Sequence, residues 1–160
     1  MNLGRYEEAI ISHDKALEIK SDDYRPWNNW GVALWHLGRY EEAIKLYYQS
    51  LNIAREMGDP SGEGTALVNI GESQLKLRQY PESLTNNQAA LKIFREIGDR
   101  FGEAEALKNL AEVHQALGEV EVARQYCQQA IALATELGIP LAAECEALLL
   151  KIENDDRKED

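Results

Sequence analysis

Residues 37–44 carry the stretch Leu-Gly-Arg-Tyr-Glu-Glu-Ala-Ile, and the same eight residues occupy positions 3–10, thirty-four positions earlier. An identity of this length indicates an internal repeat. A fixed period between about 20 and 50 residues is the signature of a solenoid or a similar array. Because each unit of such an array covers an apolar face of its neighbour, the repeat predicts the architecture of the whole chain.

The repeated unit is predicted to be a pair of helices. Residues 24–37 and 40–57 each carry apolar or small side chains at helical spacing. Gly38 and Gly58 follow these two stretches, at the place where a helix C-terminus favours glycine. The pair Gly58-Asp59 returns as Gly98-Asp99, which gives the later units a step of forty residues.

We therefore expect one repeat domain over residues 1–153. Its parts are a partial unit at 3–20, full units at 24–59, 61–99 and 101–138, a terminal helix at 141–152, and a frayed charged tail at 154–160. Small residues such as Gly31, Gly71 and Ala43 are expected where the two helices of a unit cross. Asn87 stands where Tyr47 stands one unit earlier, so the helix around Asn87 is predicted to be the least tightly packed.

These residues carry a resemblance to a known family. The pattern of a first-helix Trp, paired small residues and a second-helix Ala is formed by Trp27, Gly31, Gly38, Tyr40, Ala43, Tyr47 and Ser50, with Ala9, Ala16 and Leu17 before them. It resembles the tetratricopeptide repeat signature over residues 3–150. The forty-residue step is similar to the longer variant found in kinesin light chains, polarity scaffolds and bacterial regulators. The resemblance implies an all-α, right-handed superhelix whose first helices line a concave groove.

Composition excludes several classes of function. The net charge of −11 argues against nucleic acid, because its binding depends on Lys and Arg contacts to phosphate, and favours a neutral to basic protein or peptide partner. No export signal and no apolar run long enough for a membrane span is found, so a cytoplasmic setting is expected. Cys127 and Cys145 are predicted to be small buried hydrophobic residues. We expect no metal, no cofactor and no enzymatic activity, since no catalytic constellation is found.

The candidate binding residues begin with Asn29, Asn69 and Asn109, which recur at the forty-residue step. The resemblance places them on the concave face, where such Asn side chains hydrogen-bond the backbone of a bound segment. An amide suits this role because it offers both a donor and an acceptor. The alternative is that these side chains only bridge adjacent helices.

Helical spacing places further groups on the same surface: Asn28, Val32, Trp35, Glu72, Leu75, Lys108 and Glu112. Trp35 is a candidate anchor, since Trp is enriched at interface hot spots. Its alternative role is packing against the next repeat. Glu72 and Glu112 are candidates to accept a Lys or Arg of a ligand, unless they form an ordinary solvated face.

The sequence thus predicts a non-catalytic protein-interaction module that binds a peptide segment in the groove, as an adaptor or sensor part of a larger protein. The alternative is a self-association module. The helix at residues 4–19 has no first helix before it, and its apolar residues Ile10 and Leu17 could pair with those of a second copy.

Overall fold

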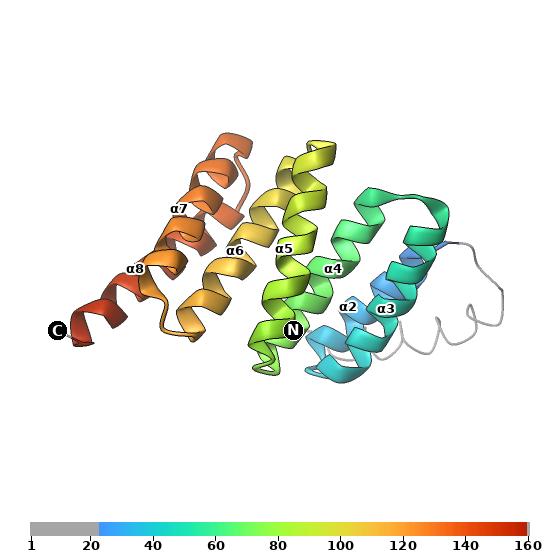
Figure 1. Cartoon of the computed structure of the whole chain (residues 1–160), viewed down its shortest axis with the longest axis horizontal. Coiled ribbons are helices and arrows are strands. Elements are labelled where there is room, and N and C mark those ends of the chain that lie inside the picture. Colours follow the sequence, from blue (N-terminus) through green and yellow to red (C-terminus); the bar gives the residue numbers. More distant parts are fainter. Residues whose placement is uncertain (1–22, 160) are drawn as a thin grey trace.

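The computed structural model describes residues 23–159, which contain seven helices and no strand. The helices are α2 (Arg25–His36), α3 (Tyr40–Met57), α4 (Pro60–Lys76), α5 (Tyr80–Ile97), α6 (Arg100–Ala116), α7 (Val120–Leu137) and α8 (Leu141–Glu159). They follow one another in a row, from α2 and α3 at one end to α7 and α8 at the other (Figure 1). The predicted all-α helical repeat fold is confirmed. The partial unit expected at residues 3–20 lies outside the described residues.

The two sides of this row differ in how the helices touch. Each helix packs on the next one, and α4 in addition contacts both α2 and α6, while α6 contacts α8. Within the described residues the backbones of α3 and α5, and those of α5 and α7, do not come within 8 Å between Cα atoms, although the Arg95 side chain of α5 reaches Gln129 of α7. The helices α2, α4, α6 and α8 are therefore closer to one another than α3, α5 and α7 are. This difference curves the array toward the side of α2, α4, α6 and α8. We call this side the inner face.

The turns between helices use left-handed backbone at one residue each. Gly58 has φ +66° after α3, and Gly118 has φ +75° after α6. Arg78 occupies the corresponding turn after α4 with φ +59°, and it is the non-glycine residue with positive φ among the described residues. A side chain costs about 1–2 kcal/mol in this conformation.

Replacing Arg78 by glycine is expected to raise the free energy of unfolding by about 0.5–1 kcal/mol. The gain from removing the strained Cβ is partly offset by the greater freedom of glycine in the unfolded chain. Urea denaturation of both proteins measures the difference. The reverse change Gly118→Arg is the matched control and should destabilise; a stability loss in Arg78→Gly would contradict the argument.

Close helix crossings depend on residues without side chains. A Cβ on Gly31 would lie 2.5 Å from the Tyr47 ring, and a Cβ on Gly102 would lie 2.5 Å from the Phe94 ring. Gly64 meets the same Phe94 ring from α4, with its added Cβ at 2.7 Å. The aromatic rings of the second helices thus fill the space that glycine leaves on the first helices.

The expectation that the helix around Asn87 is loosely packed is wrong at that residue. Asn87 is completely buried. Its Nδ2 donates to the carbonyl oxygen of Ser83 at 2.9 Å, and its Oδ1 accepts from Asn109 Nδ2 at 3.1 Å. A buried amide is costly only when its hydrogen bonds are unmade, and Ser83 and Asn109 supply the partners that the sequence pattern did not reveal.

The last helix departs from the forty-residue step. Asp59 and Asp99 cap α4 and α6, since Asp59 Oδ1 accepts from the backbone N–H of Ser61 at 3.0 Å and Asp99 Oδ1 from that of Gly102 at 3.0 Å. Ile139 stands at the next corresponding position and has no side-chain oxygen. Accordingly α8 begins at Leu141, one residue later than the step from α6 predicts.

The C-terminal end differs from the expectation as well. The segment predicted to fray from residue 154 continues as helix to Glu159. Cys145 on α8 is completely buried, as is Cys127 on α7, and Cys127 Sγ lies 3.0 Å from the carbonyl oxygen of Cys145. Among the described residues, no helix combines the length and the apolarity needed to cross a membrane.

Candidate functional site

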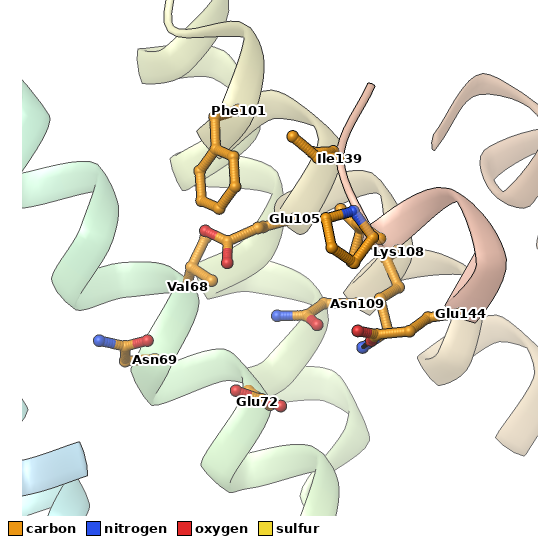
Figure 2. Close-up of a pocket in the computed structure, with 11 residues that line it drawn as sticks. Val68, Asn69, Glu72, Phe101, Glu105, Lys108, Asn109, Ile139 and Glu144 are labelled. Atoms are coloured by element: carbon orange, nitrogen blue, oxygen red, sulfur yellow. Dashed lines mark hydrogen bonds and ion pairs between the residues drawn. The ribbon is translucent and has the colours of Figure 1, made fainter. Parts of the chain in front are cut away.

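A cavity of about 270 Å³ opens on the inner face between α4, α6 and α8. Figure 2 shows the side chains that line it. They are Val68, Asn69 and Glu72 on α4, Phe101, Glu105, Lys108 and Asn109 on α6, and Ile139, Pro140, Leu141 and Glu144 at the start of α8 and in the turn before it. We call this space the α4–α8 cavity.

One part of the lining is apolar. Phe101 is 52% exposed although it is a large aromatic residue, and Ile139, Pro140 and Leu141 face it from the turn before α8. In the preceding unit the position of Phe101 is held by Ser61. An exposed apolar rim beside polar groups is a common property of binding sites.

Two carboxylates of the cavity have no ion pair. No cation lies within ion-pair distance of Glu105 or Glu72 in the described part of the chain. Burial raises the pKa of Glu105 to about 7, and the negative charge of Glu72 adds to this effect. Burial also raises the pKa of Glu72, against the opposing influence of Lys108.

Lys108 is held to one side of the cavity. Its Nζ lies 3.0 Å from a carboxylate oxygen of Glu144 and 3.7 Å from one of Glu112. Burial by itself would lower the pKa of Lys108, but Glu112 and Glu144 more than offset this, so that the pKa is raised. The ammonium group is therefore charged and already paired.

The three predicted Asn residues lie in three different environments. Asn29 is exposed, Asn69 is half-buried and donates from Nδ2 to Asn28 Oδ1 at 2.8 Å, and Asn109 is only 4% exposed. Asn109 and Asn69 both line the α4–α8 cavity, and Asn29 does not. Asn28 and Asn69 join α2 to α4, as the bridging alternative for the Asn side chains predicted.

The remaining predicted residues lie outside the α4–α8 cavity. Leu75 and Glu112 line a second cavity of about 530 Å³ at the other end of α4 and α6. Trp35 and Val32 pack partly buried against the core. The Trp35 ring lies 5.8 Å from Lys76 Nζ on α4, a contact of the kind that the packing alternative described.

Sequence reasoning missed Phe101, Glu144 and the residues of the turn at 139–141. Aligning Phe101 with Ser61 at the forty-residue step would have drawn attention to an apolar residue at a polar position. Glu144 carried no such signal. It corresponds by the step to Ala104, which is completely buried, so the repeat gave no reason to expect a carboxylate at the cavity there.

Several solved structures are similar to this chain along nearly its whole length. A Rap protein complexed with Competence and Sporulation Factor is 17% identical with a TM-score of 0.83, covering 98% of this chain and 46% of that one. Aspartyl phosphate phosphatase F from Bacillus subtilis is 20% identical with a TM-score of 0.80, covering 96% and 41%. A Podosopora anserina putative kinesin light chain with nearly identical TPR-like repeats is 17% identical with a TM-score of 0.72, covering 98% and 82%.

At these identities the likeness shows the fold alone. The chain spans about half the length of the Rap protein and about two fifths of the phosphatase. No curated protein matches the sequence.

The family is shown by sequence. A tetratricopeptide repeat model matches residues 22–71 and 62–136, and a second model with the same description matches residues 1–23. The predicted resemblance is confirmed, and this fold is typically a protein-interaction scaffold. The chain belongs to the tetratricopeptide repeat family.

Proposed function

We propose that this chain is a non-catalytic interaction module that binds an extended segment of a partner protein along the inner face, across α4, α6 and α8. The observation that carries the proposal is the α4–α8 cavity. It combines an exposed aromatic residue, Phe101, with polar groups that the described part of the fold leaves unpaired. The chain would serve as the adaptor or sensor part of a larger protein.

The size of the cavity supports a side chain of a longer segment as the occupant. Its volume of about 270 Å³ lies just below the roughly 300–1,000 Å³ of sites for whole small molecules. The similar Rap protein is complexed with Competence and Sporulation Factor, and this complex is a property of that protein. For the present chain, this complex supports the proposal only in that a protein of the same fold binds a partner.

Phe101→Ser tests the proposal with a display library of random short peptides selected on the parent chain. Ser is the residue that the preceding unit carries at this position, and Phe101 is half exposed, so the fold should tolerate the change. We expect the selected peptides to bind Phe101→Ser about 10- to 30-fold more weakly, since an aromatic anchor contributes about 2 kcal/mol. Fluorescence anisotropy measures the affinities.

Met57→Ser is the matched control. Met57 is 55% exposed at the end of α3, away from the inner face. Equal losses in the two variants, or a library without any enriched peptide, would count against the proposal. The double variant Asn69→Ala, Asn109→Ala is a poorer test of binding, because Asn109 also satisfies the buried Asn87 and its loss would disturb the fold.

The self-association alternative rests on residues 4–19. These residues, with Ile10 and Leu17, lie outside the described part of the chain. The alternative therefore stays a prediction of the sequence, and the solution mass measured by light scattering over a range of concentrations tests it.

A further inference from the structure

We propose that the α4–α8 cavity binds the guanidinium group of an arginine side chain in the partner segment, with Glu105, Glu72 and Asn109 as its acceptors. The inference rests on the proposed function and names the chemistry that the same cavity selects. Three features support it: the acceptors that the cavity presents, the buried position of Asn109, and the place of Lys108.

Most of the polar atoms that the cavity offers are acceptors. Each Asn side chain of the lining uses one N–H of its amide inside the protein, since Asn69 Nδ2 donates to Asn28 and Asn109 Nδ2 donates to Asn87. Their Oδ1 atoms receive no hydrogen bond within the described residues. Together with the unpaired carboxylates of Glu105 and Glu72, these oxygens require a ligand that brings donors.

Asn109 lies at the floor of the cavity. Only 4% of this residue remains accessible, and the part that remains open faces the cavity. Figure 2 shows its amide between Glu105, Glu72 and Lys108. The amide oxygen of Asn109 accepts no hydrogen bond from the described residues and is not fully enclosed, so a water or a ligand in the cavity can donate to it. Asn109 therefore marks a place for a donor.

Lys108 is the cation that the chain itself supplies to the lining. Its Nζ is taken by Glu144 at 3.0 Å and by Glu112 at 3.7 Å. Among the described residues, Glu105 and Glu72 are therefore left without a positive partner. The lining holds one ammonium group and three carboxylates, at Glu72, Glu105 and Glu144. One or two positive charges from a ligand would therefore neutralise the charge of the lining.

Arginine fits this set better than lysine does. A guanidinium group carries five N–H donors in a plane and can serve two carboxylates and an amide oxygen at once, whereas an ammonium group carries three donors at a point. The exposed ring of Phe101 at the mouth offers a face on which a guanidinium group can stack. The apolar residues of the turn at 139–141 would contact the methylene groups of the same side chain.

The test uses peptides enriched on the parent chain by display of random sequences. We expect arginine at one position of these peptides. Synthetic versions, acetylated and amidated, in which norleucine replaces that arginine should bind about 10- to 100-fold more weakly, because charge-assisted hydrogen bonds are lost. Lysine at the same position should give an intermediate affinity, and removal of the acetyl group should change little. Isothermal titration calorimetry measures each affinity.

Glu105→Gln is the matching change in the protein. It should lower the affinity for the arginine peptide by a similar factor, so that the arginine and norleucine peptides bind with similar affinity. Glu56→Gln, an exposed residue on α3, is the control for the same loss of charge. Burial disfavours the charge of Glu105 in the folded chain, so removing that charge does not destabilise the fold, and loss of folding does not explain weaker binding.

The affinity should also fall when the pH is lowered from about 8 to 6, since Glu105 must be ionised to accept the guanidinium group. The titratable groups that face Glu105 are Glu72 from α4, Lys108 from α6, Asp99 at the start of α6 and Glu144 from α8. Glu105→Gln should remove most of this pH dependence.

The outcomes separate this inference from the proposed function. Peptides that depend on Phe101 but show no preference for arginine would overturn the inference and leave the proposed function standing. Equal binding of the lysine peptide would overturn the guanidinium assignment, and a gain on deacetylation alone would assign the cavity to an amino terminus instead. Absence of any bound peptide would overturn both proposals.

Discussion

Replacing Phe94 by alanine is expected to lower the free energy of unfolding by about 3–5 kcal/mol. Phe94 is 1% exposed, and its ring lies between Gly64 of α4 and Gly102 of α6. Glycine has no side chain that could move into the space, so the cavity left by the ring would stay largely open. The loss should therefore lie toward the upper end of the range.

The measurement is urea denaturation followed by circular dichroism. Because a repeat array is stabilised by contacts between neighbouring units, the variant should also unfold over a broader range of denaturant, as the two ends of the array lose their coupling. Phe101→Ala removes the same ring from an exposed position and should cost less than about 0.5 kcal/mol. A loss below about 1 kcal/mol in Phe94→Ala would show that the crossing can close around the missing ring.

Replacing Glu105 by glutamine is expected to stabilise the folded chain above pH 7 by up to about 3 kcal/mol. The pKa of Glu105 is about 7 in the folded chain, against an ordinary value of 4.5, and each pH unit corresponds to about 1.36 kcal/mol. The folded chain holds this proton more tightly than the unfolded chain does. Stability is thus lost as the pH rises from about 4.5 to 7, and the whole loss is present above 7.

Glutamine is neutral at every pH, so the advantage of the variant should be largest near pH 8 and should vanish near pH 4.5. Comparing the variant with the parent at each pH cancels the titration of all other groups. Glu56→Gln should change stability little at either pH, because Glu56 is exposed. A variant that is less stable than the parent at pH 8 would show that the Glu105 carboxylate has a stabilising partner.

A change that stabilises the chain and weakens binding would identify Glu105 as a binding residue. Replacing a residue that supports the fold lowers the stability of the chain, whereas replacing a residue kept for binding often raises it. If the Glu105 carboxylate serves a ligand, Glu105→Gln should raise the free energy of unfolding and lower the affinity for the peptide. A residue that only supports the fold would not give this combination.

Much of the fold could be predicted because its rules are local. The helix Tyr40–Met57 has the bounds that the sequence indicated, since Gly58 marks its end and the apolar spacing marks its buried face. The glycines at the crossings, such as Gly31 against Tyr47, followed from the repeat itself. Local patterns fail where a partner comes from another helix, as Asn109 does for Asn87.

The sequence by itself determined that the chain is a helical repeat array of the tetratricopeptide family, because an identical stretch at a fixed step, apolar spacing and turn glycines are all properties of neighbouring residues. The tertiary structure alone decided which of the inner-face residues meet. Asn109 and Asn69 line one cavity while Asn29 stays exposed, and Glu144 reaches the same cavity from α8. Lys108 then pairs with Glu144 across two helices, and this choice of partner leaves Glu105 and Glu72 without a cation from the described part of the chain.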